Sequence, residues 1–355
     1  MQQFSDSPWT GRSRFRAACY HKPADTTPVW FMRQAGHVLG AYRALREKYD
    51  ILTLARTPEL CAEISLLPVK EYGVDAAVMF TDIVLPLPGM GLTTELDPTI
   101  GPIIQNPVRT MYDVAALRVS EAVEATPFVT EAIRLVRDEL AGKQALIAIA
   151  GAPFTLALYI IEGRPSRDYH VAKALMHEQP AVWHALLHKL SDVLARYVRA
   201  EVQAGADAVQ LFDSSVGILG PFDYKKFVQP YSRRVLDAVR HAGATSIHFG
   251  MANASLLELM TEAGGDVLGV DWRVDIDTAW EQIGVEEHGI QGNLDPTLLL
   301  APWETVRAAT LDILRRVDAR PGHIFNLGHA IHPATNPDYL HRLVDMVHLD
   351  GGRVS

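Results

Sequence analysis

Short apolar runs that alternate with helical patterns constrain the fold of this chain more than any other feature of its sequence. Buried parallel strands look like this, because other elements cover both faces of such a strand. Eight runs of this kind occur, at residues 28–33, 75–82, 145–151, 207–213, 245–250, 266–272, 289–295 and 323–329. Eight strands that alternate with helices predict an α/β fold of the (β/α)8 TIM barrel type.

Proline and glycine mark the ends of the predicted helices. One helical pattern begins near Pro58 and stops at Gly73, and a long amphipathic pattern ends at Gly205. A doubly wound open sheet is the alternative, but no GxGxxG follows the first run and no Walker loop occurs. No linker or low-complexity tract divides the chain. We therefore expect a single domain over residues 1–355, with a short N-terminal extension of about residues 1–25.

Composition and charge exclude several classes of partner. The net charge is −9, so neither nucleic acid nor an anionic membrane surface is expected as the main partner. Residues 145–161 carry no charge, but Gly151 and Pro153 interrupt them, which favours a strand, a turn and a helix over a membrane span. Cys19 and Cys61 lack CxxC spacing and fit a reducing compartment.

A basic segment stands out in this acidic chain. Arg33, His37, Arg43 and Arg46 fall within fourteen residues, at and after the end of the first predicted strand. Active sites of TIM barrels lie at the C-terminal ends of the strands, and arginine offers a planar fork to carboxylate or phosphate. The segment therefore predicts contacts with anionic substrate groups, and a loop of solvated arginines is the alternative.

Eight sequence blocks stand at or near the ends of the predicted strands. They are VWFMRQAG (29–36), FTDI (80–83), GAPFTLALYIIEG (151–163), LFDS (211–214), IHFG (247–250), GVDW (269–272), GNLDP (292–296) and FNLGH (325–329). In this order they resemble the uroporphyrinogen decarboxylase family. The resemblance implies removal of CO2 from the four acetate side chains of uroporphyrinogen III, to give coproporphyrinogen III in haem biosynthesis. It also implies a cytoplasmic homodimer that needs no metal and no organic cofactor.

The resemblance also assigns roles to individual residues. It implies substrate binding by Arg33, Gln34, Ala35, Gly36, His37, Arg46, Asp82, Tyr159, Ser214 and His329. Arg33, Asp82 and Tyr159 are expected to be catalytic. Ionised Asp82 would accept the pyrrole N–H groups and stabilise the cation that forms when a ring carbon is protonated before CO2 leaves. The proton donor stays open between Arg33, Tyr159 and His329.

One departure from the family pattern concerns substrate binding. His37 stands where the family has a second arginine, and Gly40 stands where it has proline. Histidine is only partly charged at neutral pH and has no guanidinium fork. We expect weaker substrate binding, which improves at lower pH, and a looser loop.

Two other functions are compatible with the same fold. In a corrinoid- or thiol-linked methyltransferase, zinc would be bound by His-x-Cys, but here Phe249 and Gly250 follow His248 and no cysteine follows residue 61. His184 and His188 have metal-pair spacing without a third ligand in view. The other function is that of a non-catalytic tetrapyrrole-binding paralogue. Retention of the catalytic set favours an enzyme, a cofactor-independent carboxy-lyase.

Overall fold

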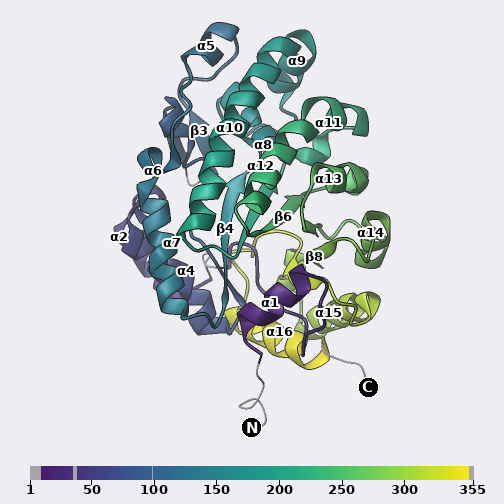
Figure 1. The fold of residues 1–355 in the computed structure, drawn as a ribbon. Coiled ribbons are helices and arrows are strands. Elements are labelled where there is room, and N and C mark those ends of the chain that lie inside the picture. Colours follow the sequence, from purple (N-terminus) through teal and green to yellow (C-terminus); the bar gives the residue numbers. More distant parts are fainter. Residues whose placement is uncertain (1–8, 35–37, 98, 352–355) are drawn as a thin grey trace.

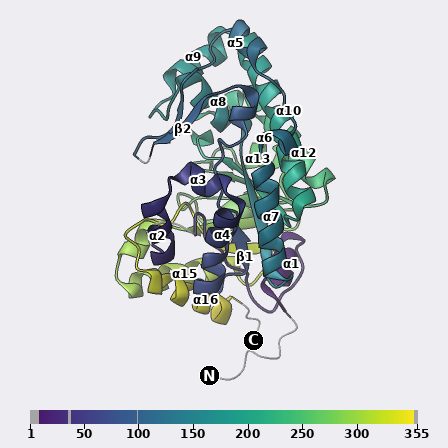
Figure 2. The same cartoon turned by 90° about the vertical axis from the view of Figure 1, so that its left-hand side faces the viewer.

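A sheet of seven parallel strands lies at the centre of the computed structural model, which describes residues 9–34, 38–97 and 99–351 (Figure 1). Each strand pairs with the next one along the chain. The strands are β1 Ala76–Val78, β4 Ala145–Gly151, β5 Ala208–Asp213, β6 Thr245–Gly250, β7 Val267–Gly269, β8 Gly289–Leu294 and β9 His323–Leu327. The helices between them cover the outside of the sheet (Figures 1 and 2). The predicted α/β TIM-barrel fold is confirmed.

Residues 28–30 close the barrel between the last strand and the first. Val29 forms a parallel bridge with Phe325, and the Phe325 N–H donates to the Pro28 carbonyl at 2.9 Å. On the other side, the Asp75 N–H donates to the Val29 carbonyl at 2.9 Å. This segment therefore takes the place of the eighth strand.

The segment does not form the regular strand that its apolar run predicted over residues 28–33. The Trp30 N–H donates to the Phe325 carbonyl of β9 at 3.3 Å, but the N–H groups before and after it donate to side-chain oxygens. They are Asp75 Oδ2 for Val29 (2.8 Å), Gln34 Oε1 for Phe31 (3.1 Å) and Asn326 Oδ1 for Met32 (3.0 Å). Because these groups bond to side chains, the ladder stops after a single bridge.

The outer helices begin and end largely where the sequence indicated. α4 runs over Pro58–Tyr72 and ends at Gly73 with a φ of 70°, and α10 runs over Pro180–Ala204 and ends at Gly205. The uncharged stretch forms β4, a turn and α8 (Pro153–Glu162), as predicted. No helix in the described ranges is long and apolar enough to cross a membrane.

The remaining elements complete the outer layer. Its other helices are α1 Gly11–Cys19, α2 Gly40–Lys48, α3 Ile51–Arg56, α5 Met111–Ala116, α6 Ala122–Ala125, α7 Pro127–Leu140, α9 His170–Glu178, α11 Pro221–Phe227, α12 Gln229–His241, α13 Leu257–Ala263, α14 Ile276–Ile283, α15 Trp303–Val317 and α16 Pro337–Asp350. Three short 3-10 turns lie at Leu87–Met90, Val216–Ile218 and Pro296–Leu300. A hairpin of β2 Thr94–Asp97 and β3 Gly101–Ile104 lies outside the barrel sheet.

Part of the predicted N-terminal extension packs against the foot of the barrel, the end opposite to the C-terminal ends of the strands. α1 lies there, where the Arg12 N–H donates to the Lys143 carbonyl at 2.9 Å and the Arg12 guanidinium pairs with Asp207 at 2.7 Å. A Cβ on Gly11 would lie 2.7 Å from the Asp75 backbone, so only glycine permits this close approach.

Candidate active site

The C-terminal ends of the strands, called the mouth below, carry the predicted site residues. Asp82 follows β1, and Ser214 directly follows β5. Tyr159 lies on α8, which begins just after β4, and His329 stands two residues beyond β9. Because parallel strands all end at the same side, residues far apart in the sequence converge there.

Arg33 leaves the closing segment in a left-handed turn. Its φ is 53° and its side chain is exposed. The neighbouring Gln34 is fully buried, and its Nε2 donates to the Ala76 carbonyl at 2.9 Å while its Oε1 accepts the Phe31 N–H. A residue other than glycine keeps a positive φ only where its surroundings fix it. The buried amide of Gln34 fixes the turn that presents Arg33.

Asp82 lies half-buried at the mouth, and its carboxylate has one backbone partner. Its Oδ1 accepts the Val84 N–H at 3.0 Å. Burial raises the pKa of Asp82 above its ordinary value, while the Val84 N–H and the positive charge of Arg33 act in the opposite direction. The protein therefore compensates the negative charge of Asp82 only in part. A cation bound next to this carboxylate would stabilise it further.

Tyr159 belongs to the same electrostatic group. Burial raises its pKa, the nearby Tyr169 and the charge of Asp82 raise it further, and Arg33 lowers it. The ring centroids of Tyr159 and Tyr169 lie 6.3 Å apart. The Tyr159 hydroxyl therefore stays protonated at neutral pH and is available as a hydrogen-bond donor.

His329 is half-buried at the mouth, just beyond β9. Burial lowers its pKa to about 4, Arg33 and Arg273 lower it as well, and Asp271 acts against them. Its ring lies 6.3 Å from that of Phe249. The imidazole is therefore neutral at pH 7 and can accept or donate one hydrogen bond.

Arg46 lies on the helix that follows the turn of Arg33, and its guanidinium bonds to a backbone carbonyl. It lies on α2, and its Nη1 donates to the Tyr49 carbonyl at 2.8 Å. The buried Tyr42 has its pKa raised by burial, and both Arg46 and Arg33 lower it. Both arginines therefore lie within electrostatic range of Tyr42, whose ring centroid lies 5.5 Å from that of Phe80.

Three predicted substrate-binding residues, Ala35, Gly36 and His37, lie outside the described residues. Of the remaining predicted set, Arg33, Asp82, Tyr159 and His329 come together electrostatically. Ser214 is half-buried at the end of the neighbouring strand. The side chain of Gln34, in contrast, is fully buried behind the mouth.

A buried contact behind Ser214 was not predicted from the sequence. Asp213 is fully buried, and its Oδ1 accepts the Thr155 hydroxyl at 3.0 Å. The same hydroxyl accepts the Ser215 N–H at 3.4 Å. Thr155 precedes Tyr159 by four residues on α8. One hydroxyl therefore joins the loop of Ser214 to the helix that carries Tyr159.

Two phenylalanines at the strand ends were also missed. The Phe212 and Phe249 rings lie 5.6 Å apart, and Phe249 contacts His329. Successive strand residues point to opposite faces, so Phe212 and Ser214 share a face while Asp213 points toward the helices. The alternation in LFDS contained this signal.

Comparison with known proteins decides the family. A family model described as Uroporphyrinogen decarboxylase (URO-D) matches residues 10–349. The chain belongs to the uroporphyrinogen decarboxylase family. The protein named "Uroporphyrinogen decarboxylase" of Carboxydothermus hydrogenoformans is 50% identical over 334 residues, which cover 94% of this chain and 95% of that protein. The protein of the same name from a Roseiflexus species is 48% identical over 342 residues, with 95% and 98% covered. The predicted resemblance is confirmed.

A solved structure extends the likeness at the level of the fold. A methyltransferase from Methanosarcina mazei matches with a TM-score of 0.79 and 20% identity, over 96% of this chain and 98% of that one. At this identity the match shows a common fold. The chemistry of this uroporphyrinogen decarboxylase family member has to be inferred from its own residues.

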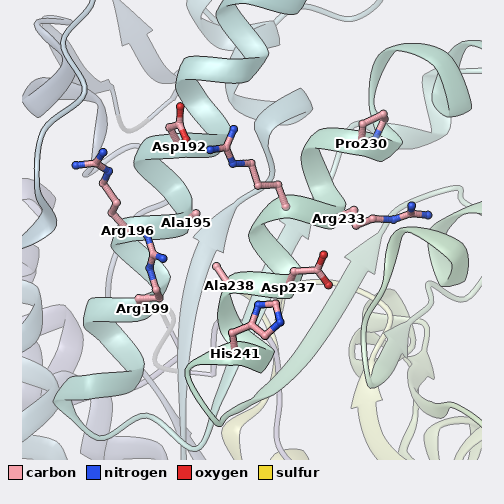
Figure 3. A pocket seen from close by; sticks show the side chains of 10 residues that line it. Asp192, Ala195, Arg196, Arg199, Pro230, Arg233, Asp237, Ala238 and His241 are labelled. Carbon is pink, nitrogen blue, oxygen red and sulfur yellow. Dashed lines mark hydrogen bonds and ion pairs between the residues drawn. The ribbon is translucent and has the colours of Figure 1, made fainter.

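A groove of about 510 Å³ lies on the outer helices of this family member, away from the strand ends (Figure 3). Ala195 and Ala238 line it between α10 and α12, together with arginines and aspartates of both helices. Arg196 pairs with Glu121, and Arg234 pairs with Asp192. Two of the four arginines that line the groove therefore already have acidic partners, and we assign no chemistry to it.

Metal-binding residue types are dispersed in the described part of this family member. No group of three or more His, Cys, Asp or Glu side chains is placed there to hold an ion. His184 Nδ1 contacts the Tyr231 hydroxyl at 2.8 Å, and His188 Nε2 lies 3.7 Å from Asp192. Both histidines of the predicted helical pair therefore contact neighbouring side chains.

Proposed function

We propose that the chain is a uroporphyrinogen decarboxylase, which converts uroporphyrinogen III and four protons into coproporphyrinogen III and four CO2 in haem biosynthesis. Family membership over residues 10–349 supports the proposal. The observation that carries it is the half-buried carboxylate of Asp82 at the mouth, coupled to Arg33 and Tyr159. This is the arrangement that a cationic pyrrole intermediate requires.

Direct loss of CO2 from an acetate would leave an unstabilised carbanion. Protonation of the adjacent pyrrole carbon creates an iminium cation, which accepts the electron pair when the bond to CO2 breaks. A second proton converts the exocyclic methylene into a methyl group, and the ring then loses the first proton. Asp82 stabilises the cation and accepts the pyrrole N–H, because a fixed carboxylate interacts more strongly with it than water does. The pyrrole itself takes the role of an electron sink.

The first proton is assigned to the Arg33 side of the substrate. Burial raises the pKa of Tyr159 and lowers that of His329 to about 4, so the Tyr159 hydroxyl keeps its proton and the His329 imidazole is neutral at pH 7. The exposed guanidinium of Arg33 can orient a water or a substrate carboxyl toward the ring. His329 and Tyr159 then act as neutral hydrogen-bonding groups.

The substrate carries eight carboxylates, and the other site residues have to bind them. We propose that Arg33 and Arg46 bind carboxylates, with Gln34 fixing the turn. Ala35, Gly36 and His37, which lie outside the described residues, are assigned to substrate binding from the family pattern alone, and Ser214 is proposed to donate from the loop after β5. These roles are carried from the family pattern onto the matching positions of this chain.

The proposal also covers the domain organisation, the cofactor requirement, the oligomeric state and the location of the enzyme. We propose one functional domain that works without metal or organic cofactor, as a homodimer in the cytoplasm. A methyltransferase is not proposed, because the match to the Methanosarcina mazei protein is one of fold.

The test is an anaerobic assay of metal-free protein with chemically reduced uroporphyrinogen III. Products are oxidised and separated by their number of carboxylates. The proposal predicts accumulation of the four-carboxylate product. Unchanged substrate, with folded protein and an active relative in parallel, would overturn it.

A further inference from the structure

Arg273 stands at the mouth but was not among the predicted site residues. It follows β7 in the segment Asp271–Trp272–Arg273, and 46% of its side chain is exposed. Its guanidinium lies 4.2 Å above the ring of Trp272. Stacking occupies the face of a guanidinium and leaves the N–H donors at its edge available.

A buried carboxylate holds this arginine in place. Asp271 is 1% exposed, and its Oδ2 pairs with Nη1 of Arg273. The Asp271 oxygens also accept the N–H of Arg273 at 3.0 Å and the N–H of Ala252 at 2.7 Å. Asp271 and Trp272 together fix the orientation of the guanidinium, which lowers the entropy lost when it binds a ligand.

The segment packs directly against the residue before His329. A Cβ on Gly328 would lie 2.7 Å from the Trp272 nitrogen, so only glycine fits there. On the other side, the Asn293 Nδ2 donates to the carbonyls of Asp271 at 2.9 Å and Val274 at 2.7 Å. Three strand ends therefore fix Arg273 beside His329.

Two guanidinium groups act on the same imidazole. Both Arg33 and Arg273 lower the pKa of His329. Arg33 lies at the end of the closing segment, and Arg273 lies after the end of β7. Asp271, the partner of Arg273, acts on the pKa of His329 in the opposite direction, so all three charged groups lie within electrostatic range of this imidazole.

We propose that Arg273 is a substrate-binding residue that holds one carboxylate of the porphyrinogen beside His329. The inference rests on the proposed function, which supplies a polycarboxylate substrate. Among the described residues, Arg273 makes one side-chain ion pair, through Nη1, so its Nε and Nη2 edge is available for a carboxylate fork. Its role is in binding rather than in proton transfer.

The test compares Arg273→Gln, Arg273→Lys and Arg320→Gln in the anaerobic assay, over a range of uroporphyrinogen III concentrations. Arg320 is the matched control, because its guanidinium also stacks on a tryptophan (Trp280, 4.8 Å) but lies between α15 and the start of β9, at the foot of the barrel. Arg273→Gln is expected to raise KM about tenfold with kcat within about twofold. The KM of Arg273→Lys should lie between those of the wild type and Arg273→Gln, and Arg320→Gln should keep the wild-type KM.

A KM for Arg273→Gln within about twofold of wild type would overturn the inference, whatever happens to kcat. Melting temperatures of all three variants separate loss of binding from loss of folded protein. Absence of turnover in the wild type would instead contradict the proposed function. The two failures are therefore distinguishable.

Discussion

At the scale of the residue, two aspartates at the ends of strands β1 and β5 differ by their surroundings. Asp82 is half-buried, with one backbone N–H on its carboxylate, whereas Asp213 is fully buried and bonded to Thr155. The first carboxylate can meet a substrate cation, and the second is part of the framework. Sequence position alone makes them look alike, because both follow an apolar strand.

Tyr159 supports a prediction at this scale. In the proposed mechanism its protonated hydroxyl serves as a neutral hydrogen-bond donor at the mouth, so Tyr159→Phe should lower kcat/KM about tenfold without abolishing turnover. Tyr231→Phe is the control, since it removes a half-buried helical hydroxyl on α12 that contacts His184. A Tyr159→Phe enzyme as active as the Tyr231→Phe enzyme would contradict this role.

At the scale of the element, the Thr155 hydroxyl links α8 to the end of β5 and to the loop that follows it. Thr155→Val keeps the shape but leaves Asp213 Oδ1 without its donor and frees the Ser215 N–H. We expect the free energy of unfolding to fall by about 1–3 kcal/mol. Because both Ser214 and Tyr159 shift, kcat/KM should also fall about tenfold.

The matched control for Thr155→Val is Thr310→Val on α15. Thr310 is also fully buried in a helix, with its hydroxyl bonded to the Val306 carbonyl at 2.9 Å. Both variants are measured by denaturant unfolding and by steady-state rates. Equal activity in the two variants would show that the contact stabilises the fold without positioning the site.

Elements with local signals were predictable from the sequence. Pro58 and Gly73 fix the ends of α4, because proline lacks the N–H that a first turn leaves unpaired and glycine adopts the left-handed cap. The strand ends that carry Asp82 and Ser214 were predicted in the same way, from the apolar runs that precede them. The family resemblance supplied their chemistry.

Features that depend on distant partners were not predictable. The first strand lost its ladder because Asp75 and Asn326, far along the chain, take its N–H groups. The burial of Gln34 depends on the Ala76 carbonyl. Arg273 was missed because its position depends on packing against Gly328. Spacing along a sequence contains none of these contacts.

At the scale of the whole molecule, a buried histidine makes stability depend on pH. His323 is 2% exposed, its Nε2 contacts the Gly292 carbonyl at 3.0 Å, and burial lowers its pKa to about 4. The unfolded chain, with an ordinary histidine pKa, binds a proton at a pH where the folded chain does not. Stability contributed by the neutral form is therefore present above pH 6.5 and is lost as the pH falls toward 4.

This linkage gives a measurable difference between variants. Between pH 7 and pH 5, His323 should account for a loss of about 2 kcal/mol in the free energy of unfolding. His323→Gln should lose about that much less over the same interval, measured by urea denaturation. His241→Gln, at an exposed position on α12, should follow the wild type. Parallel curves for all three proteins would contradict the assignment.

The most direct measurement of the central claim is anaerobic turnover of uroporphyrinogen III by wild type, Asp82→Asn and Asp295→Asn, side by side. Asp295 is a matched control, because it is also half-buried after a strand and its Oδ1 accepts an N–H two residues later, from Thr297 at 2.8 Å. Loss of the carboxylate under the cation should lower kcat by about 100-fold or more in Asp82→Asn, with wild-type rates in Asp295→Asn. Four-carboxylate product formed by Asp82→Asn at a rate near that of wild type would contradict the account.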